Sequence, residues 1–266
     1  MTDALTVGRH TLIGIREGVF LMPLDFLGVD EAHRALADPD GVVRLPIGAF
    51  LMPGEEPLLI DAGLGPGFPR PDLMTGGSLL EGLASAGVGR AEVRHLALSH
   101  LHPDHVGWVA TKDGGPTFPN AQVYVAEADW RHFLQEGHRG PAPWIEQALV
   151  DLAERGRVTF LEGERQLVSG LTALPAPGHT PGHTVYAVHD GADRALLLGD
   201  AIYCPQQLTE DDWGAASEVD PVLARRTREW LWREIEDTGA SAVGQHFPGL
   251  QAGRVLNRAW QPVAGR

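Results

Sequence analysis

Short apolar runs recur along the chain, and most of them end at a glycine, proline or aspartate. Runs of this length, bounded by turn residues, are typical of strands. They predict strands at 45–52, 58–60, 93–98, 122–126, 158–161, 171–174, 184–188 and 195–198, and a last strand that leads into 243–246. Apolar spacings of three and four residues predict helices between them, at 78–86, 127–135 and 144–155.

The clearest helix is expected at 221–238. Asp220 suits its N-cap, Pro221 its first turn, and Gly239 its end. The residues expected on its buried face are Val222, Leu223, Trp230, Leu231 and Ile235. Strand and helix signals alternate without a linker, so residues 1–266 are expected to form a single α/β domain.

The composition is that of a globular protein and narrows the choice of partners. The chain has 266 residues, of which 43% are hydrophobic, and this excludes a disordered chain, collagen and a coiled coil. Its 35 acidic and 21 basic residues give a net charge of −14, which disfavours nucleic acid. No secretory signal pattern is seen, and the apolar runs are too short to cross a membrane. We therefore expect a cytoplasmic protein that binds neither nucleic acid nor membrane.

The densest chemistry lies in the segment S-H-L-H-P-D-H at 99–105, directly after a predicted strand. The carboxyl ends of strands are where α/β sheets place ligand sites. In an extended chain, spacing by two directs His100, His102 and Asp104 to one side, and a turn then brings His105 to the same point. Three imidazoles and a carboxylate suit zinc, iron or manganese. The segment predicts a metal site.

Further candidate ligands lie in three later segments. The loop P-G-H-T-P-G-H at 177–183 carries His179 and His183, Asp200 follows a buried strand, and His246 follows the last predicted strand. The single cysteine, Cys204, excludes a thiolate-rich zinc site and reads as a packed thiol. Each candidate lies at or beside a strand end, as convergence on one edge of a sheet requires.

In their order along the chain, these motifs resemble the metallo-β-lactamase-fold hydrolase superfamily over residues 43–248. The resemblance implies a four-layer αββα sandwich that binds two divalent metal ions, with zinc favoured and iron, cobalt and manganese as alternatives. The implied ligands are His100, His102 and His179 for the first metal, Asp104, His105 and His246 for the second, and Asp200 as the bridge. Asp61, in the motif L-I-D-A-G, and His183 would hold these ligands in position without binding the metals themselves.

Within the superfamily, D-A-I-Y at 200–203 is similar to the N-acyl-homoserine lactonase and organophosphate hydrolase branch, as are 105–108 and 116–121. The resemblance implies an enzyme that opens lactones, with N-acyl-homoserine lactones (quorum quenching) as the expected substrates. A hydroxide bridging the metals would attack the ring carbonyl, with Tyr203 and one metal stabilising the oxyanion. The second metal would receive the leaving alkoxide, and Asp104 or Asp200 would handle its proton.

Several apolar residues near the start of the chain are candidates to line an acyl-chain pocket: Met22, Leu24, Phe26, Phe50, Met52 and Phe68. The alternative functions are a phosphotriester or aryl-ester hydrolase and a hydroxyacylglutathione-type thioesterase, for which Arg254 and Arg258 supply the nearest basic charge. A non-enzymatic metal-binding module is the least favoured, and a homodimer is left open. The other histidines are expected to be surface or packing residues: His10, His33, His95, His132, His138 and His189.

Overall fold

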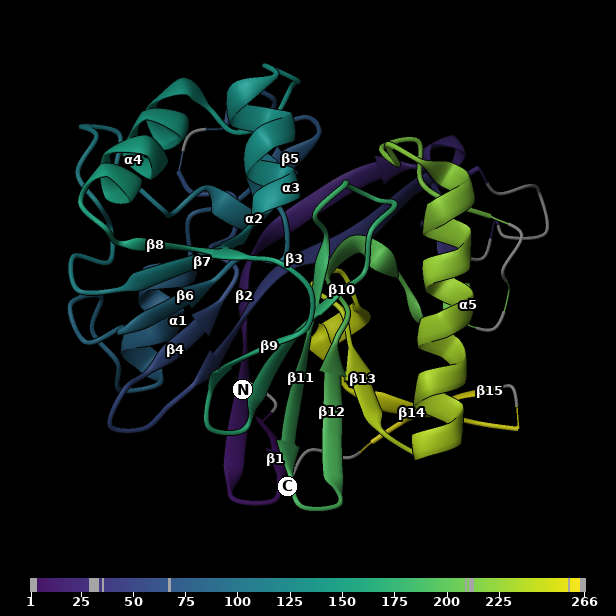
Figure 1. Cartoon of the computed structure of the whole chain (residues 1–266). Coiled ribbons are helices and arrows are strands. Elements are labelled where there is room, and N and C mark those ends of the chain that lie inside the picture. Colours follow the sequence, from purple (N-terminus) through teal and green to yellow (C-terminus); the bar gives the residue numbers. More distant parts are fainter. Residues whose placement is uncertain are drawn as a thin grey trace.

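Two β-sheets lie face to face, and helices cover the outer face of each sheet (Figure 1). The computed structural model describes residues 4–28, 34, 36–66, 68–208, 210, 213–257 and 259–263. The succession of helix, sheet, sheet and helix confirms the expected αββα sandwich. Within the described residues, no helix combines the length and apolar character needed to span a membrane.

The first sheet combines a long antiparallel hairpin with a parallel half. Its strands, in spatial order, are β1 (Ala4–Val7), β2 (His10–Pro23), β3 (Val42–Met52), β4 (Leu58–Ile60), β6 (His95–Ala97), β7 (Gln122–Ala126) and β8 (Val158–Leu161), with β5 (Met74–Thr75) paired to β2. Strands β4, β6, β7 and β8 run parallel, so their carboxyl ends meet at one edge. Helices α1 (Leu79–Ser85) and α4 (Pro143–Glu154) pack on its outer face.

The second sheet is antiparallel apart from one parallel pair. Its strands, in spatial order, are β15 (Ala259–Pro262), β14 (Gly253–Leu256), β13 (Ser241–Val243), β12 (Asp193–Leu197), β11 (Thr184–Asp190), β10 (Leu171–Pro175) and β9 (Arg165–Val168). Helix α5 (Pro221–Thr238) covers its outer face (Figure 1). Two short helices, α2 (Pro103–Val106) and α3 (Glu127–Trp130), follow strands of the first sheet, and α3 continues as a π-helical turn, Arg131–Gln135.

The alternation of side chains along a strand divides the core into layers. In β4, Leu58 and Ile60 pack between the two sheets, whereas Leu59 packs under the outer helices. Because successive side chains of a strand point to opposite faces, one short apolar run supplies both layers. A strand buried on both faces therefore reads as continuously apolar rather than alternating, as this one does.

The prediction for the buried face of α5 was wrong in part. The helix has the expected bounds, its N-cap Asp220 accepts a hydrogen bond from the Leu223 amide, and Gly239 ends it in the left-handed region. Val222 and Trp230, however, are 65% and 38% exposed. Their places on the buried face are taken by Ala224, Thr227 and Arg228.

The rotation of α5 is set by a close backbone contact. A Cβ atom at Gly178 would lie 2.2 Å from the Ala224 nitrogen, so the helix lies directly against the loop that carries His179. The Thr227 hydroxyl also donates a hydrogen bond to the Pro177 carbonyl. The small residue Ala224 and the polar residue Thr227 therefore face this loop, because its backbone leaves no room there for larger apolar side chains.

Candidate metal centre and active site

Side chains from both sheets meet at the edge where β4, β6, β12 and β13 end. Asp61 follows β4, and the segment 99–105 follows β6. From the second sheet, the loop before β11 carries His179, Asp200 follows β12 and His246 follows β13. All seven predicted metal ligands fall into two groups, which share this edge.

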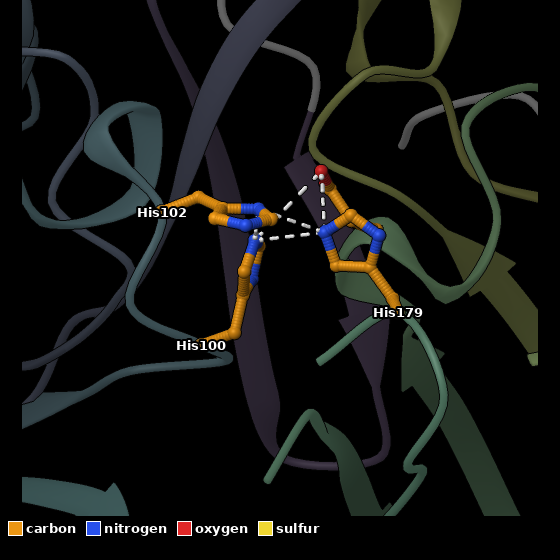
Figure 2. A group of neighbouring side chains, drawn as sticks. His100, His102 and His179 are labelled. Atoms are coloured by element: carbon orange, nitrogen blue, oxygen red, sulfur yellow. Dashed lines mark hydrogen bonds and ion pairs between the residues drawn. The ribbon is translucent and has the colours of Figure 1, made fainter. Parts of the chain in front are cut away.

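The first group consists of His100, His102 and His179, whose rings point toward one another (Figure 2). The Nε2 atom of His179 lies 3.2 Å from His100 Nε2 and 2.9 Å from His102 Nδ1. The remaining pair, His100 Nε2 and His102 Nδ1, is separated by 3.0 Å. Asp200 Oδ2 completes the group at 3.5 Å from His179 Nε2 and 3.8 Å from His100 Nε2.

The second group consists of Asp104, His105 and His246. The other oxygen of Asp200, Oδ1, lies 3.1 Å from His105 Nε2 and 3.2 Å from His246 Nε2. Asp104 Oδ2 lies 3.5 Å from His246 Nε2 and 3.9 Å from His105 Nε2. The Asp200 carboxylate is therefore placed between the groups, with one oxygen facing each.

The expectation that Asp104 shares one side of an extended chain with His100 and His102 was wrong. The chain turns into helix α2 at Pro103, so Asp104 and His105 come from one helical turn and face the second group. Proline favours this change because its fixed φ suits the first position of a helix.

The ring nitrogens and the carboxylate oxygen that face the middle of each group are arranged as ligands of divalent cations rather than as hydrogen-bond partners of one another. His105 Nδ1 lies 2.8 Å from Asp61 Oδ2, and His246 Nδ1 donates to the Pro46 carbonyl at 2.7 Å. These bonds leave a lone pair on each inner Nε2 atom. Both Nε2 atoms and Asp200 Oδ1 are buried and have no hydrogen-bond partner among the residues that the structure describes. Buried polar atoms normally have partners, so the convergence of lone pairs on two points fits two divalent metal ions.

Asp61 is completely buried and gathers the segments around the second group. It accepts hydrogen bonds from the Ser99 amide at 2.7 Å, the Ser99 hydroxyl at 2.8 Å and Gln245 Nε2 at 2.6 Å, besides its contact with His105. Its φ of 62° is uncommon for a residue other than glycine, asparagine or aspartate. These contacts place Asp61 behind His105, on the side away from the second group of candidate ligands.

His183 contacts the segment that carries Asp200. Its Nε2 atom accepts a hydrogen bond from the Asp200 amide at 3.0 Å. Burial lowers the pKa of His183 to about 4, so the imidazole stays neutral and its Nε2 atom remains an acceptor near neutral pH. The structure places His183 against the backbone of Asp200 rather than in either group of candidate ligands.

Tyr203 is buried beside the second group. Its ring stacks on His246 with centroids 5.2 Å apart and an interplanar angle of 3°. Its hydroxyl lies 3.0 Å from Ser217 Oγ. Burial, followed by the charge of Asp200, raises the pKa of Tyr203 well above its ordinary value. The phenol therefore remains protonated and can donate a hydrogen bond.

Sequence reasoning missed Glu17, a buried carboxylate on β2. It accepts hydrogen bonds from the Leu64 amide at 3.0 Å, the Gly65 amide at 3.3 Å and Trp108 Nε1 at 3.0 Å. These bonds fix the loop after Asp61. The available signal was a lone carboxylate within an apolar strand, but β2 itself was not predicted.

Asp129, on α3, was also missed. It accepts hydrogen bonds from the Thr180 hydroxyl at 2.9 Å and the Gly182 amide at 2.6 Å. Burial raises its pKa to about 6. Asp129 thus holds the loop that carries His179, and these two partners lie more than 50 residues away in sequence, where no local pattern shows them.

The residues proposed for an acyl-chain pocket divide into two sets. Phe50 and Met52 pack in the core between the sheets, and Met22 is fully buried in a cluster that also contains Tyr203. Leu24 packs against the same cluster as Met22.

Phe26 and Phe68 do line cavities. Phe26 contacts Tyr203, with ring centroids 6.3 Å apart, and lines a cavity of about 320 Å³ with Trp213. Phe68 lines another, of about 280 Å³, against α2. Of the two basic residues named for a thioesterase, Arg254 hydrogen-bonds Ser241 Oγ, whereas Arg258 lies outside the described residues, as does His33.

Comparison with known proteins identifies the family. Residues 44–246 match the metallo-beta-lactamase superfamily. N-acyl homoserine lactonase AiiA of Bacillus thuringiensis subsp. kurstaki is 26% identical over 217 residues, which cover 74% of this chain and 80% of the relative. N-acyl homoserine lactonase AttM of Rhizobium johnstonii is 32% identical over 177 residues, 61% of each chain.

Two solved structures share the fold over nearly the full length. The hydrolase AbOPH of the beta lactamase superfamily superposes with a TM-score of 0.85 at 24% identity, covering 98% of this chain and 96% of its own. AidC, described as a dizinc quorum-quenching lactonase, superposes with a TM-score of 0.83 at 24% identity, covering 100% and 97%. Since the family match spans most of the chain and includes every residue of both groups, the chain belongs to the metallo-β-lactamase superfamily.

Proposed function

We propose that this protein is a dinuclear metal-dependent hydrolase that opens the ring of N-acyl-homoserine lactones. The observation that carries the proposal is the Asp200 carboxylate set between two groups of imidazoles, with the Tyr203 ring stacked on one of them. The named relatives AiiA and AttM, which are N-acyl homoserine lactonases, support the choice of substrate. The seven candidate ligands and the supporting roles of Asp61 and His183 are part of this proposal.

The side chains have separate roles in the proposed reaction. The chemistry that two bound divalent cations, zinc being the simplest choice, supply at such a site is a lowered pKa for water and a polarised carbonyl. Tyr203 donates a hydrogen bond from its protonated hydroxyl to the carbonyl oxygen, where negative charge develops. Asp104 or Asp200 holds the proton that the leaving alkoxide takes up. The outer hydrogen bonds of His105 and His246 keep both rings oriented.

The cavity beside α2 is the proposed site for the acyl chain. Its apolar wall includes Leu64, Phe68, Val106 and Ile145, and the helix that forms one side also carries Asp104 and His105. Its volume of about 280 Å³ lies at the lower end of the range for small-molecule pockets, so one unbranched chain fits better than a bulky group. Of the six apolar residues that the sequence suggested for an acyl-chain pocket, Phe68 alone is among the described residues that line this cavity.

A phosphotriester or aryl-ester hydrolase is the second candidate. The stretches at 105–108 and 116–121, which are similar to the lactonase and organophosphate hydrolase branch, favour it, and the same groups of ligands would serve either reaction. The location in the cytoplasm and the single domain also remain predictions, and a homodimer remains a possibility.

A hydrolysis panel on protein of known metal content tests the assignment. It should include homoserine lactones with short and long acyl chains, a paraoxon-type phosphotriester, an aryl ester and a glutathione thioester. We expect kcat/KM to be highest for the lactones and to depend on acyl length. Greater turnover of the phosphotriester would favour the second candidate, and full metal occupancy without turnover would favour a binding module.

A further inference from the structure

A third set of metal-binding side chains lies outside the site described above, at the end of the π-helical turn after α3. Glu136 Oε2 lies 3.8 Å from His132 Nδ1 and 3.5 Å from His138 Nε2. The two imidazole rings are stacked, with centroids 4.0 Å apart and an interplanar angle of 12°. Sequence reasoning assigned both histidines to the surface or to packing, because nothing in their spacing resembles the family motifs.

The backbone brings these side chains together. Gly137 has a φ of 75°, a left-handed conformation that favours glycine and reverses the chain after the π-helical turn. The reversal returns the His138 amide to the His132 carbonyl, with the two atoms 3.4 Å apart. His138 is consequently stacked over His132 rather than directed away from the turn. Such π-helical turns are rare and often accompany functional sites.

One of the three side chains is fixed before any ligand arrives. The His132 side chain is 14% exposed and packs edge-on against Phe133, with ring centroids 4.7 Å apart. Glu136 and His138 are 51% and 55% exposed, so an ion can reach them from solvent. A partly buried histidine with two accessible ligands forms a half-organised site, which lowers the entropic cost of binding.

The donor spacing matches that of the metal centre. The distances of 3.5 and 3.8 Å to the Glu136 oxygen fall within the range of 3.1–3.9 Å between Asp104 or Asp200 oxygens and the histidine nitrogens of the centre. Ligands of a tetrahedral zinc ion, at bonds of about 2.0–2.2 Å, are separated by about 3.3–3.6 Å. In the stacked arrangement the two ring planes are nearly parallel, so the exposed His138 ring must turn out of the stack for its nitrogen to meet the same ion as His132 and Glu136.

We propose that His132, Glu136 and His138 bind one divalent transition-metal ion such as Zn²⁺, with water in the fourth position. Because two of its three ligands are half exposed, this site binds more weakly than the buried centre and responds to free zinc. The Phe133 ring lies between the two sites, in contact with His132 and at 5.6 Å from the His102 ring. An ion bound here therefore stiffens the segment that packs against a candidate ligand. The inference does not depend on the identity of the substrate.

Zinc binding to the full chain tests the proposal. Protein with a loaded centre is dialysed against buffers of increasing free zinc, up to millimolar, and its metal content is measured by elemental analysis. We expect a third, dissociable equivalent beyond the two retained. His138→Gln and Glu136→Gln should each weaken only the third equivalent, by about 10-fold or more.

His189→Gln is the matched control, because His189 lies on β11 and hydrogen-bonds Thr172. It should leave all three equivalents unchanged. Two variants guard against a folding defect in either one, and circular dichroism checks both. A wild-type protein that stops at two equivalents would overturn the proposal, as would a third equivalent that persists in both variants.

Discussion

The Tyr203 hydroxyl lies 3.0 Å from the Ser217 hydroxyl, which approaches from the segment before α5. The same segment is tied to the metal centre through its backbone, because the Val219 amide donates to the His179 carbonyl at 3.0 Å. The phenol is therefore held from two directions, by Ser217 at its tip and by His246 against its ring face. Ser217 thus orients a group that the proposed reaction needs, although none of its contacts within the described residues is with a candidate metal ligand.

Removal of the Tyr203 hydroxyl should slow the reaction. We expect Tyr203→Phe to lower kcat by about 10- to 100-fold, because the developing oxyanion loses a hydrogen-bond donor. Ser217→Ala should cause a smaller loss, since the phenol remains but is less well oriented. Steady-state kinetics at equal metal content would measure both effects. An unchanged kcat in Tyr203→Phe would leave the tyrosine as a packing residue.

Metal removal should abolish turnover and weaken the fold. Within the described part of the chain, the Nε2 atoms of His105 and His246 and the Oδ1 atom of Asp200 contact one another but have no hydrogen-bond partner, so chelation leaves buried polar atoms unsatisfied. We expect a Tm several degrees lower in the chelated protein and recovery when zinc is restored. His102→Ala and Asp104→Asn should each lower bound metal and activity together. Full turnover after exhaustive chelation would contradict a metal-dependent mechanism.

Asp61 should act on the second metal through His105. In Asp61→Asn the carboxylate that accepts hydrogen bonds from His105, Ser99 and Gln245 is lost, so His105 is held less firmly. We expect about 10- to 100-fold weaker binding of one metal equivalent, measured by competition with a chelator. Asp113→Asn, at an exposed carboxylate, is the control and should bind both equivalents normally.

Asp129 should make stability depend on pH in a defined window. Its pKa is raised from 3.8 to about 6 by burial, so the folded protein binds its proton more tightly than the unfolded chain does. The stabilising contribution is full below about pH 4 and is lost as the pH rises through 6. Two pKa units correspond to about 3 kcal/mol as an upper figure.

The Asp129→Asn variant measures this contribution. It lacks the titrating group and keeps a carbonyl for the Gly182 amide. Its free energy of unfolding, relative to the wild type, should therefore improve between pH 4 and pH 7. Chemical denaturation at several pH values would show it, and metal loss at low pH affects both proteins alike. A constant difference between the two proteins would show that Asp129 does not titrate in this window.

Phe68 should determine how tightly long acyl chains bind. Phe68→Ala removes apolar surface from the cavity beside α2, so KM should rise for long-chain lactones while short-chain substrates are little affected. Phe160→Ala, at a partly exposed ring on β8, is the control. An equal change for all chain lengths would exclude this cavity as the acyl site.

The sequence by itself determined most of the architecture and the chemistry of the centre. Predicted strands such as 58–60 and 122–126 coincide with β4 and β7, because apolar runs and turn residues are local signals. The motif at 99–105 is also a local signal, and it indicated metal ligands because so many histidines and aspartates in one short segment have few roles other than metal binding. Strand β2 was missed, as were β1, β5, β9, β14 and β15, which are short, at sheet edges or broken by polar residues.

Only the tertiary structure decided which atoms meet. Asp200 divides its two oxygens between groups that come from both sheets, and Ser217 reaches Tyr203 from a segment that carries no motif. The roles of Glu17 and Asp129 can be recognised only from their hydrogen bonds to backbone amides about 50 residues away in the chain. Burial, hydrogen-bond partners and the rotation of α5 depend on distances between remote segments. Periodicity within one segment cannot encode those distances.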